Sequence, residues 1–382
     1  MSAVLHPPAI KTRVPMSEKA MQTWTSRYPD YRAPADAPAL AHASTVSSLW
    51  NMRLVPMLSP QGSAGRFSQA ALSCPERACT GFGELAAGAV TRAYRNTDAI
   101  ENILCLEGKL KVRVGPKLER SITLERFDMV SVPVDVRHAI ENTGGVPGRM
   151  VICLNGPTGS TWPAVFDQVA GLPAEALTAL SVSFDAAAGL ALEDGEIEGR
   201  VTRGEQLVAY KRELSASSGI PPQATEMLSA GSVYPLIVPV GHSGRARKAP
   251  MYGLPSLYLS IAECTPGEAG PPPHSHSDTQ ESFLCIEGEW EMTTGFHHEH
   301  VTKVKPYDIV AMPTKVMRGF RNTGPGRSRL FVVIQGAEQM TDMVAFPKRV
   351  GVEMEKRFGP QVIKDFEKIH LIFDAEDRVE AA

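Results

Sequence analysis

The stretch from Glu268 to Gly288, EAGPPPHSHSDTQESFLCIEG, combines possible metal ligands with the start of a strand. Its three prolines fix φ and lack N–H donors, so we expect the strand to begin near His274. Alternate residues of a strand share a face, so His274 and His276 can both point inward. Glu281 follows after enough chain for a turn to bring its carboxylate back to the imidazoles. Two imidazoles and one carboxylate suit a divalent first-row metal, so the stretch predicts one metal ion on His274, His276 and Glu281.

An internal repeat extends outward from this stretch. ENILCLEGKLKV, which begins at Glu101, matches ESFLCIEGEWEM, which begins at Glu281, 180 positions later. FDMVSVPVDVRHAIENTG and YDIVAMPTKVMRGFRNTG match at the same offset. One offset that holds across both segments means that neither copy has a net insertion between them. The sequence therefore predicts a tandem duplication of one domain.

Both copies show short apolar runs that end at Gly, Pro or Asn, such as ILCLEG, MVSVPV, FLCIEG and LFVVIQG. Many short strands with such turns indicate an all-β barrel or sandwich. The 382 residues are 43% hydrophobic and 21% charged, which is enough apolar content for two globular domains with cores of their own.

Composition argues against several function classes. The net charge of −3 leaves no basic surface for nucleic acid. No apolar run is long enough for a membrane span, and the first residues have no apolar core of signal-peptide length. The six cysteines form no CxxC pair, so we expect reduced thiols. We therefore expect a cytoplasmic protein whose partners are neither nucleic acids nor membranes.

The two motifs resemble those of the cupin family. The first has Gly, His-X-His, Glu and, after six further residues, Gly, and the spacing from Glu281 to Gly288 fits it. The second has Pro, then His, then Asn; Pro313 and Asn322 match, but Arg318 stands at the histidine position. This departure removes the family's fourth metal ligand and leaves a three-ligand site.

The resemblance implies a bicupin, that is, tandem double-stranded β-barrels of the jelly-roll type with short helical extensions. We expect the following division: an N-terminal extension (1–60), an N-terminal barrel with a degenerate site (61–160), a linker with a helix (161–235), a C-terminal barrel with the metal site (236–340) and a helical tail (341–382). The linker helix is predicted from Pro163 onward, and the tail helices near Val350–Phe358 and Pro360–Ile369. The resemblance also implies that such extensions wrap the other barrel or a second subunit.

Arg318 has two possible roles. Because Arg318 aligns with the histidine of the second motif, we expect its side chain to point to where the fourth imidazole of the family would lie. Because arginine stays protonated and binds oxyanions in a forked geometry, it could be a catalytic residue that clamps an anionic substrate beside the metal. Alternatively, it pairs with Glu281, which would make that carboxylate a poorer metal ligand.

In the N-terminal copy, Tyr94 and Asn96 stand at the two histidine positions, and only Glu101 and His138 remain. One carboxylate and one imidazole are too few for an ordinary metal site. We therefore predict that this copy has lost its metal and is structural. The alternative is a separate ligand pocket formed by these four residues.

Overall length and tandem barrels give a distant similarity to ring-cleaving dioxygenases of the gentisate and salicylate type. This implies a non-haem iron dioxygenase that acts on a small anionic aromatic compound, with Fe(II) favoured and Mn, Ni or Zn as alternatives. A non-oxidative metal-assisted enzyme (decarboxylase, isomerase or lyase) and a non-catalytic binding or structural bicupin are the other hypotheses. We expect a small-molecule substrate and a homo-oligomer.

Overall fold

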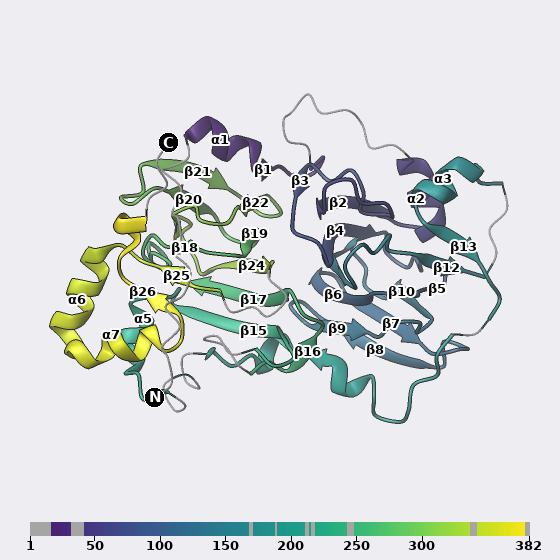
Figure 1. Cartoon of the computed structure of the whole chain (residues 1–382). Helices are drawn as coiled ribbons and strands as arrows, with labels where there is room; N and C mark the ends of the chain where they lie inside the picture. The colour runs from purple at the N-terminus through teal and green to yellow at the C-terminus, as the bar shows by residue number, and fades with distance from the viewer. Residues whose placement is uncertain are drawn as a thin grey trace.

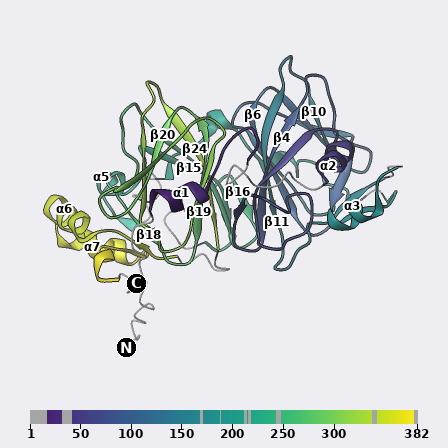
Figure 2. The same cartoon turned by 90° about the horizontal axis from the view of Figure 1, so that it is seen from above.

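The structure, a computed structural model, describes residues 17–31, 42–167, 171–187, 189–210, 214, 218–242, 248–336 and 342–378. Two β-sheet units lie side by side, the N-terminal one in blue and the C-terminal one in green (Figure 1). Seen from above, the two units again lie side by side (Figure 2). The predicted all-β fold with tandem units and short helical extensions is confirmed.

The N-terminal unit is a pair of mostly antiparallel sheets. In spatial order, the 7-stranded sheet contains β14 (Val201–Thr202), β9 (Met129–Val132), β6 (Ile100–Glu107), β11 (Gly148–Asn155), β4 (Ala78–Leu85), β2 (Arg53–Ser59) and β3 (Leu72–Ser73). The 6-stranded sheet contains β13 (Val182–Phe184), β12 (Ala164–Phe166), β5 (Tyr94–Asn96), β10 (His138–Asn142), β7 (Leu110–Val114) and β8 (Arg120–Leu124).

The C-terminal unit repeats this plan. Its 7-stranded sheet contains β1 (Thr25–Ser26), β22 (Ile309–Met312), β19 (Gln280–Glu287), β24 (Ser328–Gln335), β17 (Leu257–Cys264), β15 (Ser232–Pro239) and β16 (Met251–Gly253). The opposite side consists of two 3-stranded sheets: β18 (Ser275–His276), β25 (Val344–Ala345) and β26 (Leu371–Ile372), and β21 (His300–Val304), β20 (Trp290–Thr294) and β23 (Arg318–Asn322).

The 7-stranded sheets of the two units pack against each other. Alternate residues of a strand point to opposite faces, so Ile103 of β6 lies in the core of its own unit while Leu104 lies between the units. Leu104 shares the inter-unit cluster with Phe82, Leu284 and Phe331, all of them buried. Both faces of these sheets are thus covered, which explains why their strands are continuous apolar runs.

The short segment that precedes each unit in the sequence pairs with a strand of the other unit. β1, from the N-terminal extension, pairs with β22 of the C-terminal unit, and β14, from the linker, pairs with β9 of the N-terminal unit. Arg27 beside β1 donates to the buried Asp308 at 2.7 Å, and Arg203 beside β14 donates to the buried Asp128 at 2.7 Å. This exchange involves the N-terminal extension and the linker. The tail, for which wrapping of the other barrel was expected, packs against its own unit, where β26 pairs with β25.

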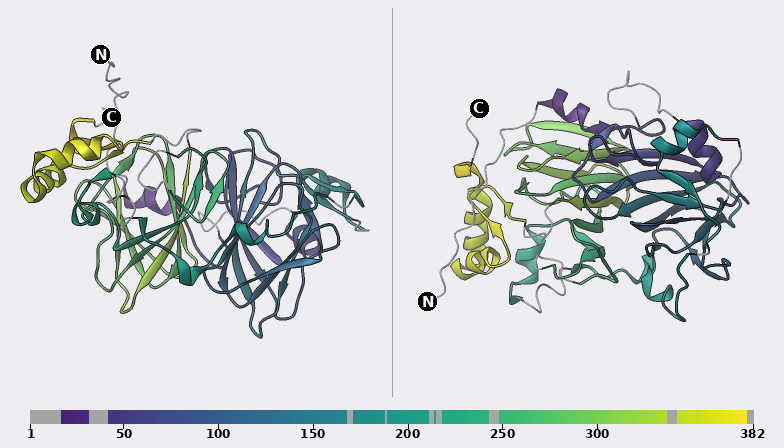
Figure 3. Two further views of the ribbon diagram at one scale, coloured as in Figure 1. Left: turned by 90° about the horizontal axis from the view of Figure 1, so that it is seen from below. Right: turned by 45° about the vertical axis from the view of Figure 1, so that its right-hand side comes forward.

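The helices of the described residues are α1 (Glu18–Thr23), α2 (Ala43–Trp50), α3 (Ala174–Ala179), α5 (Pro222–Glu226), α6 (Lys348–Phe358) and α7 (Pro360–Glu367), with 3-10 turns η1 (Glu198–Arg200), η2 (Gly204–Gln206) and η3 (Ala375–Arg378). The tail helices α6 and α7, in yellow, lie at the outer end of the C-terminal unit (Figure 3). α6 and α7 agree with the two helices predicted in the tail. Over the described part of the chain, no helix has the length and apolar character that a membrane crossing needs.

The helix predicted from Pro163 is wrong at its start. Residues 164–166 form β12, which pairs with β5 of the same sheet, and the linker helix α3 begins only at Ala174. Pairing with a neighbouring strand outweighs the helical spacing of the apolar residues, because Val165 and Phe166 are also good strand formers. Val169, which the predicted helix included, lies outside the described residues.

Candidate metal centre

The predicted ligands come from two neighbouring elements of the C-terminal unit. His276 is the last residue of β18, and His274 precedes that strand and forms a bridge with Arg318, the first residue of β23. Glu281 is the second residue of β19. The prolines 271–273 end just before His274, as expected from their missing N–H groups. The short turn at residues 277–279 then brings Glu281 back to the imidazoles.

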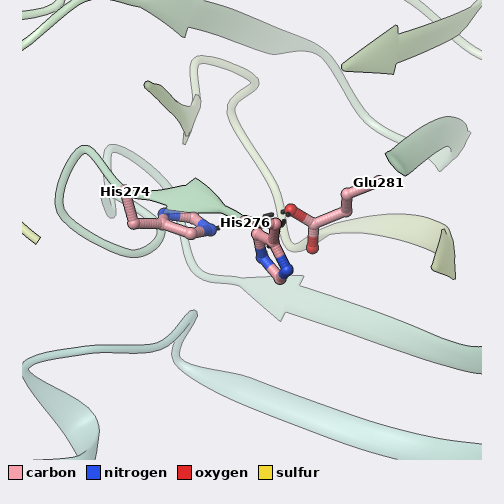
Figure 4. A group of neighbouring side chains, drawn as sticks. All are labelled: His274, His276 and Glu281. Atoms are coloured by element: carbon pink, nitrogen blue, oxygen red, sulfur yellow. Dashed lines mark ion pairs between the residues drawn. The ribbon is translucent and has the colours of Figure 1, made fainter. Parts of the chain in front are cut away.

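The three side chains point toward one another (Figure 4). His274 Nε2 lies 3.6 Å and His276 Nε2 3.4 Å from Glu281 Oε2. All three residues are buried, and together they are the one group of three or more His, Cys, Asp or Glu residues in the described chain whose ligand atoms gather closely, within 4.8 Å of one another. The structure thus brings together the residues that the sequence predicts as ligands.

Hydrogen bonds to the far side of each imidazole fix the atom that faces Glu281. His274 Nδ1 lies 3.0 Å from the backbone oxygen of Pro272, and His276 Nδ1 contacts the carboxylate of Asp342 and the hydroxyl of Thr279. A carbonyl or carboxylate only accepts, so each Nδ1 carries a proton, and a ring in this tautomer presents the lone pair of Nε2. Among the described residues, the buried atoms His276 Nε2 and Glu281 Oε2 have no hydrogen-bond partner.

The charges of the site suit a cation. Burial raises the pKa of the Glu281 carboxyl, but His276, His274 and Arg318 outweigh it and lower that pKa to about 2. Burial lowers the pKa of His274 to about 4, more than Glu281 raises it. At neutral pH the site therefore holds an anionic carboxylate beside the neutral imidazole of His274.

These atoms fit a divalent first-row metal. Metal–ligand bonds of about 2.1 Å place the ligand atoms of one ion about 3.0–3.4 Å apart. The separations of 3.4 and 3.6 Å lie close to this range. Glu281 Oε2 accepts no hydrogen bond that an ion would have to displace. The donor set, two imidazoles and one carboxylate, is also one that such metals prefer.

Arg318 lies behind Glu281. Its guanidinium is fully buried, with Nη1 3.6 Å from Glu281 Oε2, and it donates to the backbone oxygens of Val316, Met312 and Pro313. Burial lowers the pKa of Arg318, while Glu281 and Asp342 oppose that effect. Because 3.6 Å is too long for a hydrogen bond, the arginine attracts the carboxylate without occupying its lone pairs.

A cavity of about 130 Å³ opens beside the ligands. Its wall contains His274, His276 and Glu281 and is otherwise mainly apolar. The apolar and aromatic lining is Tyr210, Leu228, Ala230, Val233, Tyr258, Ala262, Pro271, Phe283, Phe320, Val332, Ile334, Val344, Ile369 and Leu371. Arg318 does not belong to this wall. A mainly apolar pocket with a few convergent polar groups is the usual form of a small-molecule site.

The equivalent place in the N-terminal unit holds an arginine. Arg66 donates to Glu101 at 2.6 Å and to Asn96 at 2.8 Å, and Tyr94 donates to Glu101 at 2.7 Å. His138 Nε2 lies 3.4 Å from the same carboxylate. The four residues predicted to lie together do so, and all of them are buried.

Aromatic rings surround this arginine. The Arg66 guanidinium lies 5.1 Å from the ring centre of Trp50 and 5.3 Å from those of Phe67 and Tyr94. A cation enclosed by aromatic faces and paired with a carboxylate is held without a metal. We therefore interpret Arg66 as the built-in cation of the N-terminal unit.

Two further sequence features lie apart from the cavity. Cys285 is buried and its Sγ contacts the backbone oxygen of Gly288 at 3.3 Å; burial raises the pKa of its thiol, which suits core packing. In the His-rich patch of residues 297–300, His298 Nδ1 bonds to Thr293 Oγ1 at 2.7 Å. Neither residue belongs to the metal-ligand group.

Sequence reasoning missed two residues, Asp342 and Arg66. Asp342 lies 61 residues beyond Glu281, in a segment without a recognisable motif, and Arg66 lies before the first repeated segment. No local spacing ties either residue to the site, because their positions depend on how the strands pair.

Comparison with known proteins supports the fold. The cupin domain family matches residues 81–154 and 260–334, which cover most of β4 to β11 and of β17 to β24. None of the curated proteins compared with the chain matches it. Among solved structures, a mutant of salicylate 1,2-dioxygenase from Pseudoaminobacter salicylatoxidans is 13% identical with a TM-score of 0.44, covering 74% of this chain and 76% of that chain.

Two other solved structures are similar to the same extent. Oxalate decarboxylase from Bacillus subtilis is 14% identical with a TM-score of 0.43, covering 77% of each chain. Vicilin from Corylus avellana is 11% identical with a TM-score of 0.45, covering 80% of this chain and 88% of that chain. The two domain matches fall on the two units of the fold, so the chain contains two cupin domains in a tandem, bicupin arrangement.

Proposed function

We propose that the C-terminal cupin domain binds one divalent metal ion through His274, His276 and Glu281 and that the chain is a metal-dependent enzyme. One observation carries the proposal: two imidazole Nε2 atoms and a carboxylate oxygen converge, buried, in the wall of a mainly apolar cavity. When bound, the ion would supply Lewis-acid chemistry, and Fe(II) would add redox chemistry.

The residues of the chain itself would bind and orient the substrate. The apolar wall, with Phe283 and Phe320, suits a small aromatic compound and excludes water from the reacting end. Arg318 is fully buried outside this wall, so we propose that it holds Glu281 in its anionic form. Of the two roles predicted for Arg318, this geometry favours pairing with Glu281 over direct contact with a substrate.

We favour a non-haem iron dioxygenase that acts on a small aromatic compound, because two histidines and one carboxylate are the ligand set of such enzymes. The alternatives are a non-oxidative metal-assisted enzyme (decarboxylase, isomerase or lyase) with Mn, Ni or Zn and a binding bicupin without turnover. The homo-oligomer, the anionic group of the substrate and the cytoplasmic location stay predictions.

Metal analysis after anaerobic purification tests the proposal. We expect about one equivalent of metal per chain, and oxygen uptake with aromatic acids if the metal is iron. His276→Ala should reduce bound metal to a small fraction, whereas His297→Ala, which changes an exposed histidine, should not. Bound Mn, Ni or Zn without oxygen uptake would favour a non-oxidative enzyme. Metal that stays bound in His276→Ala, or no binding after reconstitution, would contradict the metal site.

Arg318→His should strengthen metal binding. At the equivalent position of the N-terminal unit, His138 places Nε2 3.4 Å from Glu101, so an imidazole at this register reaches the carboxylate. A fourth neutral donor would then replace a positive charge, and we expect affinity for Zn²⁺ to rise about tenfold or more, which corresponds to about 1.4 kcal/mol. Competition with a chromophoric chelator measures this, and unchanged affinity would count against our placement of residue 318 at the site.

A further inference from the structure

Asp342 contacts the metal-site residue His276 across 66 positions of sequence. It lies in the segment between β24 and β25, and its carboxylate is about nine-tenths buried. Outside the three predicted ligands, it is the acidic residue in the wall of the cavity. A buried carboxylate needs partners, so its contacts indicate what it does.

Its two oxygens accept hydrogen bonds from four groups. Oδ1 accepts from Ser277 Oγ and from the backbone N–H of Asp278, both at 2.9 Å. Oδ2 accepts from Thr279 Oγ1 at 2.5 Å and from His276 Nδ1. Three of these donors belong to the turn at residues 277–279, and the fourth, His276, ends β18, so one carboxylate ties the turn to the strand before it.

The segment that carries Asp342 is itself fixed by strand pairing. β25 lies between β18 and the tail strand β26. The backbone N–H of Ser277 donates to the oxygen of Met343 at 3.0 Å, and the N–H of Met343 donates to Ser277 Oγ at 3.0 Å. Asp342 is therefore placed beside His276 by the hydrogen bonds of Met343, the residue that follows it.

We propose that Asp342 is a positioning residue, which holds His276 as the Nδ1–H tautomer so that Nε2 faces Glu281 and the metal. The inference rests on the proposed function for the metal and adds a residue outside the ligand set. A carboxylate that accepts from the far nitrogen of a ligand histidine fixes the ring and makes its other nitrogen more basic. Thr279 supports this arrangement because its hydroxyl lies 3.1 Å from His276 Nδ1 and donates to Asp342.

The N-terminal unit provides an internal comparison. The register His276↔Val344 of the C-terminal unit corresponds to Asn96↔Ala164 of the N-terminal unit, again 180 positions apart. By this offset, Trp162 stands where Asp342 stands, and Ala99 stands where Thr279 stands. The unit that has an amide instead of the imidazole thus lacks both the carboxylate and the hydroxyl. This pattern is expected if these groups serve the imidazole rather than the fold.

The tautomer of His276 in the metal-free full-length chain tests the inference directly. ¹⁵N NMR of histidine-labelled protein distinguishes an Nδ1–H ring from an Nε2–H ring, and the His276 signals are assigned by their loss in His276→Ala. We expect Nδ1–H in the wild type and a mixture of tautomers in Asp342→Asn. Asp278→Asn is the matched control, because it removes a neighbouring exposed carboxylate that accepts from Ser277 Oγ at 2.6 Å but does not contact His276.

Metal affinity gives the second readout. We expect Asp342→Asn to bind Zn²⁺ about 10–100-fold more weakly than the wild type, the usual effect of losing such a partner, and Asp278→Asn to match the wild type. An Nε2–H ring in the wild type, or a tautomer and affinity in Asp342→Asn equal to those of the control, would overturn the inference. A wild type with the Nδ1–H ring that binds no Zn²⁺ would overturn the proposed metal function and still support the hydrogen-bonding role of Asp342.

Discussion

Replacing Arg66 by methionine will lower the free energy of unfolding at pH 7 by about 3–5 kcal/mol, the usual cost of removing one partner of a buried ion pair. Both side chains of the Arg66–Glu101 pair are fully buried. Without the arginine, the Glu101 carboxylate keeps only Tyr94, Asn96 and His138 as partners. Urea denaturation of the full-length chain measures the change. Metal binding should not affect the comparison, because Arg66 is far in sequence from the predicted metal ligands and lies in the other unit.

The loss of stability should shrink as the pH falls. Burial raises the pKa of Glu101, but Arg66 and His138 outweigh it and hold that pKa well below its ordinary value of 4.5. A carboxyl whose pKa is lower in the folded state than in the unfolded state stabilises the fold at pH values above its unfolded-state pKa. This stabilisation is lost as the pH falls through the folded-state pKa. In Arg66→Met the carboxyl can protonate at a higher pH, so the two proteins should converge toward acid pH.

Two further variants sharpen this test. Arg113→Met removes an arginine whose partner Glu141 is partly exposed, and we expect a change below about 1 kcal/mol. Arg66→Met combined with Glu101→Gln removes both charges and should recover part of the loss. A loss for Arg66→Met no larger than that for Arg113→Met would show that the arginine is not the cation that the N-terminal unit depends on.

Glu281→Gln should reduce metal affinity by about 100-fold or more, or about 2.7 kcal/mol. The substitution removes the one anionic ligand and leaves the buried Arg318 without its nearest carboxylate. We therefore also expect the metal-free protein to lose about 3 kcal/mol of unfolding free energy, since an unpaired buried charge is costly. Chelator competition measures the affinity, and urea denaturation in the presence of EDTA measures the stability.

The two effects have separate controls. Glu291→Gln neutralises a carboxylate that pairs with the exposed Arg321 and should change neither quantity appreciably. Adding Arg318→Met to Glu281→Gln should restore stability but not metal affinity, because the unpaired cation disappears while the ligand stays absent. Metal affinity of Glu281→Gln equal to that of the wild type would exclude Glu281 as a ligand.

The ligands could be predicted from sequence because they are local. His274, His276 and Glu281 lie within eight positions, and strand alternation together with one turn brings them together. The duplication was equally visible, because its constant offset needs no knowledge of the fold. Asp342 and Arg66 were not predictable in this way, since Asp342 reaches the site only through the pairing of β25 with β18. The helix predicted at residues 164–166 failed for the same reason, as its residues have a strand partner that periodicity does not reveal.

Arg318 shows what the alignment of the two repeats can predict about a side chain and what it cannot. The repeat places it opposite Glu281, and the structure agrees, with 3.6 Å between the charged atoms. Register did not indicate that its guanidinium donates to three backbone oxygens outside the cavity wall. The chemical role of a long side chain therefore depends on surroundings that a motif does not contain.

The exchanged strands β1 and β14 make this single polypeptide resemble a dimer whose halves have been joined end to end. Arg27 and Arg203 reach across to Asp308 and Asp128 in matching ways, as two copies related by a twofold axis would do. Neither half is therefore self-sufficient: a fragment that begins after β1 would leave the edge of β22 bare and Asp308 without its arginine. Recombining halves from different bicupins would accordingly require each crossing segment to travel with the sheet that receives it.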